Sequence, residues 1–265
     1  MTAVFFLFLH HLSLGLLATL PFVPDRAGRS FFKFTSASAA FLTTAGLWLL
    51  LRRFGLQGTP ALGEAAAHHA LLVATGVYLG ATVLYNRAWH FGWDGLKAPL
   101  LWTSLAAGLV SVAAGATRPR VLVAATDLTS VLLLGAAASA MVLGHYYLVV
   151  LDLPISALRR LTVLLIVALV LRAATVTTAL VGPIHAGLDD ARLVASGLWS
   201  HDGVFIWMRL LFGLAGPFSL IWFIWKTVEI RSTQSATGIL YVQLFLVLSG
   251  ELLAKYLRVA AGVPL

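Results

Sequence analysis

The chain has 265 residues, of which 60% are hydrophobic and 11% are charged, and it carries a net charge of +8 with a mean hydropathy of +0.94. Because a soluble domain has about 25% charged residues, this composition excludes a soluble enzyme, a disordered chain and a secreted disulfide scaffold. The chain has no cysteine, which excludes disulfides, cysteine-ligated zinc and iron–sulfur clusters of its own.

Eight apolar runs of about 18 residues or more predict transmembrane helices. In chain order they cover about 3–23, 34–51, 68–86, 98–115, 126–150, 161–182, 204–226 and 237–258. The first run lacks the basic segment and cleavage site of a secretory signal, so we expect it to be retained. The fifth could begin nearer Arg120, and only the 183–203 connection is long enough for a surface helix. We therefore expect an all-α, polytopic integral membrane bundle that forms a single domain over 1–265.

Basic residues in short loops stay preferentially on the cytoplasmic side of a membrane. They are scattered over several loops, which favours contact with anionic membrane lipid rather than nucleic acid. With both termini outside, the inner loops hold nine basic residues: Arg26, Arg29, Lys33, Arg87, Lys97, Arg159, Arg160, Lys226 and Arg231. The outer segments hold seven: Arg52, Arg53, Arg118, Arg120, Arg192, Lys255 and Arg258. This count favours a multi-pass protein of the inner (cytoplasmic) membrane with N-out and C-out topology.

Ionisable residues within the predicted helices are the main candidates for a functional site, because they are costly in hydrocarbon and usually line internal sites. Most of them fall in the outer half of the bundle, where His10, His11 and Glu251 lie about 10 Å below the outer ends of their helices. His145 is the exception, near the inner end of its helix. The full set is His10, His11, His68, His69, Asp127, His145, Arg172, Arg209, Glu251 and Lys255.

Several of these residues also have purely structural interpretations. Glu251 and Lys255 are spaced i,i+4 in the order that favours an ion pair within one helix. His68 and His69 stand at a helix start, where an interfacial position is common. Arg172 is about eleven residues from either end of its helix, too deep to reach the interface easily, so we expect a buried partner or a cavity around it. The adjacent rings of His10 and His11 point about 100° apart, so at least one should face the bundle.

Glycines in two helices favour close packing rather than ligand chemistry. Gly76 and Gly80 form a G-x-x-x-G pattern, which lets a neighbouring backbone approach closely. Gly213, Gly216 and Pro217 interrupt the seventh helix and predict a kink or a packing contact.

A membrane b-type haem is one interpretation of the histidines, and it requires two neutral imidazoles on facing helices at matched depth. His10 or His11 could face His68 or His69 only if the third helix extended outward through 63–69. His145 has no histidine partner at its own depth in the predicted bundle. No metal site is otherwise predicted.

Residues 207–262 resemble the last two helices of the NrfD-like membrane anchors of polysulfide and dimethyl sulfoxide reductases. The resemblance rests on a helix with a Gly-Pro break followed by one that ends in Gly250, Glu251, Lys255 and Tyr256. The first 200 residues match only in pattern, as in 126–148. The resemblance implies a subunit that binds quinone or quinol near the outer face and exchanges electrons with an iron–sulfur or cytochrome partner docked there.

The outer polar cluster suits such a subunit, because a quinone head requires hydrogen-bonding groups in an apolar slot and titratable groups that lead to water. In this hypothesis His10 or His11 contacts the quinone, while Asp127 and Glu251 exchange protons. Arg172 or Lys255 biases the local potential, and His145 with Tyr146 and Tyr147 extends a proton route inward. The chain would then be a quinone-reactive or non-catalytic subunit of an oxidoreductase complex. A transporter would show broken helices in both halves, and a structural subunit would have mutually paired polar groups and no open slot.

Overall fold

The computed structural model describes residues 1–57, 62–115, 121–150, 153–185, 203–260 and 262, without the side chains of 53–57, 62–68 and 182–185. Within this part of the chain every regular element is helical. The spanning helices are α1 (Thr2–Thr19), α2 (Arg29–Gln57), α3 (Leu62–Phe91), α4 (Asp94–Ala114), α5 (Val121–Val149), α6 (Ser156–His185), α8 (Gly203–Leu210), α9 (Gly216–Glu229) and α10 (Thr233–Ala260). Two 3-10 turns, Leu20–Phe22 and Asp25–Ala27, join α1 to α2.

A π-helical turn, Leu211–Ala215, joins α8 and α9 into one continuous helix at the predicted break. Counted in this way, the described residues contain eight helices long and apolar enough to cross a membrane. The prediction of an all-α polytopic bundle is therefore confirmed. Several helices begin earlier than predicted, such as α2 at Arg29 and α6 at Ser156, because polar first turns stay helical outside the apolar run. Most of the 183–203 connection, the one long enough for a surface helix, lies outside the described residues.

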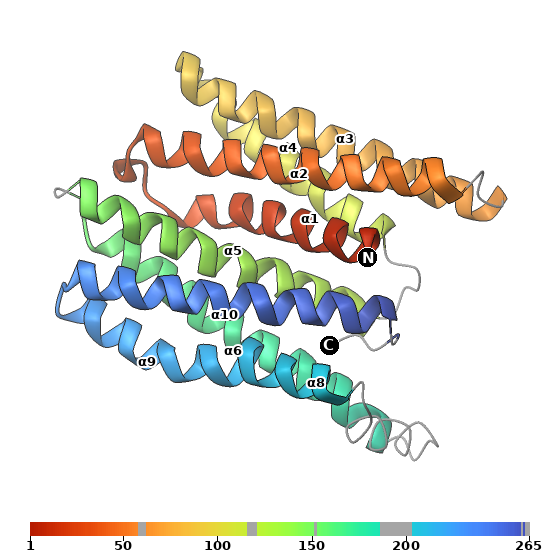
Figure 1. The fold of residues 1–265 in the computed structure, drawn as a ribbon. Coiled ribbons are helices and arrows are strands. Elements are labelled where there is room, and N and C mark those ends of the chain that lie inside the picture. Colours follow the sequence, from red (N-terminus) through yellow and green to blue (C-terminus); the bar gives the residue numbers. More distant parts are fainter. Residues whose placement is uncertain (58–61, 116–120, 151–152, 186–202, 261, 263–265) are drawn as a thin grey trace.

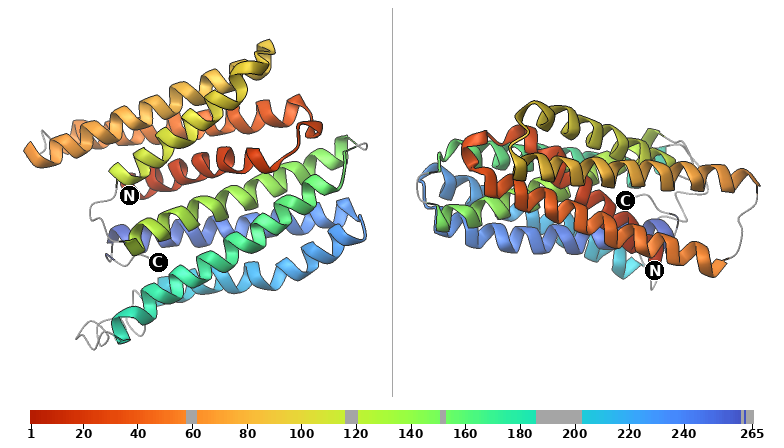
Figure 2. Two further views of the ribbon diagram at one scale, coloured as in Figure 1. Left: turned by 180° about the vertical axis from the view of Figure 1, so that it is seen from behind. Right: turned by 90° about the horizontal axis from the view of Figure 1, so that it is seen from above.

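The helices form two groups that meet at the centre of the bundle (Figure 1). Helices α1 to α4 make one group, and α5 to α10 make the other. Helix α1 packs on α5 and α10, and thereby joins the groups. The start of α1 and the end of α10 lie at the same end of the bundle, as the reverse view also shows (Figure 2). We call this end the terminal end and the other the loop end.

Two glycines let α1 and α5 cross in backbone contact. A Cβ atom on Gly135 would lie 2.6 Å from the Cα of Gly15, and one on Gly15 would lie 2.7 Å from the amide nitrogen of Gly135. Neither position can hold a larger residue without separating the helices. This crossing brings His11 of α1 toward the first turns of α5, where Asp127 and Ser130 lie.

The G-x-x-x-G pattern of α3 has no such role within this chain. Nothing lies within 4 Å of a Cβ placed on Gly76 or Gly80, and both residues are exposed. The prediction of a close helix contact there is therefore wrong for the described fold. Helix α3 instead turns into α4 at Gly92, whose φ of 74° lets the Trp93 amide donate to the Ala88 carbonyl at 2.9 Å.

Candidate functional site: a buried ion-pair network and a lipid-facing groove

Glu251 of α10 is fully buried and accepts hydrogen bonds from three other helices. Arg172 of α6 donates from Nε to Oε1 at 2.8 Å and from Nη2 to Oε2 at 3.0 Å. Arg209 of α8 donates from Nη2 to Oε1 at 2.8 Å. Ser130 of α5 donates its hydroxyl to Oε2 at 2.6 Å. Both arginines have no exposed surface, so the buried partner expected for Arg172 is present.

Asp127 is the centre of a second group of ionic contacts, and it lies one turn before Ser130 on α5. It makes an ion pair with Arg258, and its Oδ1 lies 3.8 Å from the Lys255 Nζ and 3.9 Å from the His11 Nε2. Lys255 donates to the Ser130 hydroxyl at 2.9 Å, so Ser130 links the two centres. We call Asp127, Arg172, Arg209, Glu251, Lys255 and Arg258, with Ser130, the charged network.

The network has an excess of cationic groups. Two carboxylates, of Asp127 and Glu251, face four basic side chains, of Arg172, Arg209, Lys255 and Arg258. With every group ionised, the formal sum is +4 − 2 = +2. Taking charges out of water is expensive, so the burial of these groups depends on the hydrogen bonds and ion pairs that they make with one another. Glu251 and Lys255 therefore form ion pairs with residues of other helices, Glu251 with Arg172 and Arg209, and Lys255 with Asp127, rather than with each other.

Arg209 owes its position to the glycines of the π-helical turn and of α10. A Cβ atom on Gly213 would lie 2.8 Å from the Arg209 Cζ, and one on Gly250 would lie 2.7 Å from the Gly213 amide nitrogen. The predicted packing role of Gly213 is therefore confirmed. Among the described residues, the Nε and Nη1 atoms of Arg209 have no hydrogen-bond partner, which leaves part of its donor capacity unused.

His10 and His11 are both buried and point to different sides of α1, as their spacing predicts. The His10 Nε2 lies 2.5 Å from the Ser111 hydroxyl of α4, and its ring meets Tyr78 edge-on at 5.4 Å. The His11 Nδ1 lies 3.5 Å from the Ser130 hydroxyl, beside the charged network. His10 thus contacts helices of the first group, α3 and α4, whereas His11 lies at the contact between α1 and α5 of the second group.

The other predicted histidines lie apart from this cluster. His69 is exposed on α3, nine residues before Tyr78 and therefore about 13 Å from the level of His10. The side chain of His68 lies outside the described residues. His10, His11, His69 and His145 therefore form no facing pair of the kind that a b-type haem requires.

His145 lies near the loop end of α5, where its Nδ1 is 3.2 Å from the Tyr241 hydroxyl of α10. This pair lines a groove of about 570 Å³ between α2, α5 and α10. The groove is mainly apolar, and Phe34 and Tyr241, which are 52% and 47% exposed, open it toward lipid. Its lining residues are Ser30, Phe34, Met141, Val142, His145, Tyr146, Val149, Val150 and Tyr241.

Sequence reasoning identified most charged members of the network but missed the residues that connect them. Arg258 was assigned to an outer segment, although it pairs with Asp127 inside the bundle. The only feature of the sequence that could have indicated Ser130 is its position on the same helix face as Asp127, one turn later. Tyr241 resembled any interfacial aromatic residue, because only the packing of α5 against α10 brings it to His145.

Comparisons of the chain with protein-family models, curated proteins and solved structures found no match. The resemblance of 207–262 to NrfD-like anchors therefore rests on the residues of that segment alone.

Proposed function

We propose that this protein is a quinone- or quinol-interacting membrane subunit of a respiratory oxidoreductase complex, and that the quinone head binds in the His145–Tyr241 groove. The observation that carries the proposal is the pairing of an imidazole and a phenol at the wall of an apolar groove open to lipid. Its volume of about 570 Å³ lies in the range of small-molecule pockets, about 300–1,000 Å³.

The His145–Tyr241 pair has the donor and acceptor groups that a quinone head requires. When the Tyr241 hydroxyl donates to the His145 Nδ1, the ring proton lies on Nε2 and is available to a quinone carbonyl. In the opposite arrangement the phenol hydroxyl is free to donate. Val142, Val149 and Phe34 supply the apolar wall for the ring and its tail. A bound quinone would supply two-electron, two-proton redox chemistry, and His145 and Tyr241 would hold and pass the protons.

This site differs from the one expected at the terminal end, for a physical reason. The His145–Tyr241 groove lies at the loop end, and His10, His11 and Glu251 are not among its lining residues. Protonating Glu251 would remove the counter-ion of Arg172 and Arg209, which opposes a role in proton exchange. We therefore assign the charged network a structural role. The chain has no cysteine to hold an iron–sulfur cluster of its own, so electron transfer requires an iron–sulfur or cytochrome partner. This partner would dock at the loop end, because the proposed quinone groove lies there.

The competing function is that of a purely structural subunit of a larger membrane complex. The mutual pairing within the charged network favours it, since a subunit that only packs against others needs no titratable group left free. The open groove favours quinone binding, because a structural subunit has no need of a polar pair facing lipid. The groove is therefore where the two functions can be distinguished.

Photolabelling of the purified protein with an azidoquinone tests the proposal directly. We expect labelled peptides to contain 141–150 or Tyr241, and labelling to fall in His145→Ala and Tyr241→Phe while His69→Ala, which alters an exposed histidine on α3, labels normally. Labelling confined to peptides with His10 and His11 would place the site at the terminal end instead. Labelling that no excess of unmodified quinone displaces would refute quinone binding, and co-purification of redox subunits tests the complex separately.

A further inference from the structure

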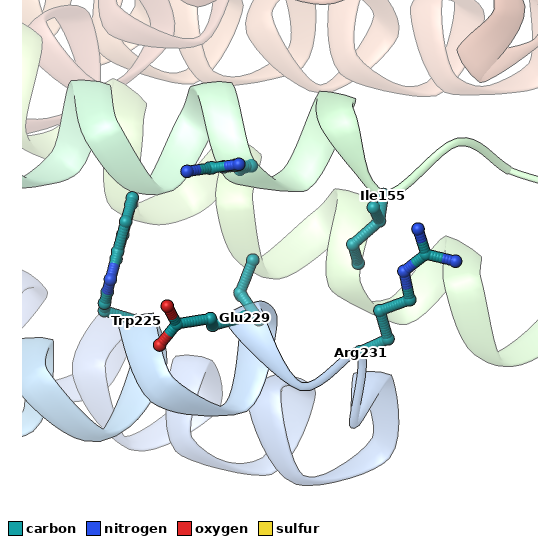
Figure 3. Close-up of a pocket in the computed structure, with 6 residues that line it drawn as sticks. Ile155, Trp225, Glu229 and Arg231 are labelled. Carbon is teal, nitrogen blue, oxygen red and sulfur yellow. The ribbon is translucent and has the colours of Figure 1, made fainter.

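A second cavity, of about 200 Å³, lies at the loop end between the start of α6 and the end of α9 (Figure 3). Ile155 lies on the α6 side, whereas Trp225, Glu229 and Arg231 belong to α9 and the turn that follows it. Arg159 and Val228 complete the lining. The cavity is separate from the His145–Tyr241 groove and shares no lining residue with it.

Two arginines give this cavity a cationic character. The Arg159 guanidinium lies 5.3 Å from the centre of the Trp225 ring, a cation–π contact that orients its planar donors. Arg231 lines the cavity from the turn after α9. The carboxylate of Glu229 is paired with Lys226 at 2.9 Å, so it is already compensated by a neighbouring cation. The cavity therefore suits a compact anion.

The backbone at Arg231 is held in a conformation that ordinarily selects glycine. Helix α9 ends in a Schellman motif, in which the Ser232 amide donates to the Thr227 carbonyl at 2.9 Å and the Arg231 amide to the Val228 carbonyl at 3.1 Å. Arg231 occupies its left-handed position with a φ of 58°, and it is the one non-glycine residue with positive φ among those described. This helix end places Arg231 in the cavity lining, beside Ile155 and across from Trp225 (Figure 3).

The surroundings of the cavity indicate that the anion belongs to a lipid. Trp222, Phe223 and Ile230 are 60%, 51% and 73% exposed, so the adjoining surface of α9 faces acyl chains. Both cavity arginines lie at helix ends, where headgroups meet the bundle. The geometry points to a binding site for the phosphate of an anionic phospholipid, held by Arg159 and Arg231 with Trp225 at the level of the interface.

Native mass spectrometry of the delipidated protein in detergent tests this site. Phosphatidylglycerol should bind with one tight site, and phosphatidylcholine with the same acyl chains should bind more weakly. Each basic residue near an anionic surface contributes about a factor of five, so Arg159→Gln combined with Arg231→Gly should weaken phosphatidylglycerol binding about 30-fold. Arg231→Gly removes the charge while relieving the backbone, so the variant is expected to fold. Arg160→Gln, the adjacent residue outside the cavity, is the matched control.

Three results would overturn the proposal. The first is equal binding of the two lipids, and the second is a double variant that binds phosphatidylglycerol as tightly as the unaltered protein. The third is binding of inorganic phosphate alone at the same arginines without any lipid preference, which would assign the cavity to a free anion. Weaker binding of phosphatidylglycerol to the Arg159→Gln, Arg231→Gly double variant, with unchanged binding to Arg160→Gln, would confirm it.

Discussion

Arg172 of α6 and Glu251 of α10 face each other through two nitrogen–oxygen pairs, at 2.8 and 3.0 Å, with neither side chain exposed. A bidentate pair of this kind fixes the rotation of both helices as well as their depth. Arg209 and Ser130 bind the same carboxylate from two further helices. One side chain thereby sets the register of four helices.

Replacing Glu251 should therefore be among the most damaging single changes in the bundle. Glu251→Gln leaves Arg172 and Arg209 buried without a counter-ion, and we expect a loss of about 3–5 kcal/mol in stability. Tryptophan fluorescence during heating in detergent would show it as a lower Tm. Glu229→Gln, an exposed carboxylate at the loop end, is the control and should leave the Tm unchanged. A similar Tm for both variants would contradict the structural role of the network.

Gly135→Ala should destabilise the α1–α5 crossing, because its Cβ would lie 2.6 Å from the Cα of Gly15. We expect a loss of about 1–3 kcal/mol as the helices separate to accommodate the methyl group. Gly80→Ala is the matched control, since nothing lies within 4 Å of its Cβ. That change should be neutral or stabilise the exposed helix by up to about 1 kcal/mol. The Tm values of both variants, measured under the same conditions, separate the two effects. A lower Tm for Gly80→Ala than for Gly135→Ala would refute the close α1–α5 crossing.

Gln243 of α10 is fully buried, and neither of its amide atoms has a hydrogen-bond partner among the described residues. An unpaired buried amide costs about 1–3 kcal/mol, so Gln243→Leu should raise the Tm of the protein. Leucine has a similar reach and no polar atoms to satisfy. A lower Tm would mean instead that water or a bound molecule satisfies the amide in the membrane.

The topology can be tested with reporters at either terminus, which the even number of described spanning helices places on one side of the membrane (Figure 1). Lys255 and Arg258 were counted as outer basic residues, but both belong to the charged network. Without them the outer count falls from seven to 7 − 2 = 5, against nine inside. We expect a C-terminal alkaline phosphatase fusion to be active and a C-terminal green fluorescent protein fusion to be dark. The opposite pattern would reverse the assigned orientation.

The sequence was sufficient for the parts of the structure that depend on one helix at a time. Apolar run lengths predicted the eight spanning helices, and the depth of Arg172 predicted a buried partner. The identity of that partner depends on how two helices rotate against each other, which local spacing does not encode. For this reason helix spacing suggests only Lys255, its neighbour on α10, as an ion-pair partner of Glu251, and not Arg172 or Arg209. The pairing of His145 with Tyr241 was missed for the same reason, since Tyr241 alone is an ordinary interfacial aromatic residue.

The order in which the charged network is synthesised has a consequence for biogenesis. Asp127 and Arg172 leave the ribosome on α5 and α6, well before Glu251, Lys255 and Arg258 appear on α10. Until α10 inserts, Arg172 lacks its ion pair with Glu251, and Asp127 lacks its ion pairs with Lys255 and Arg258. Insertion of α10 therefore completes the assembly of the terminal end. A chain interrupted before that helix would hold Asp127 and Arg172 in the bilayer without their ion-pair partners on α10.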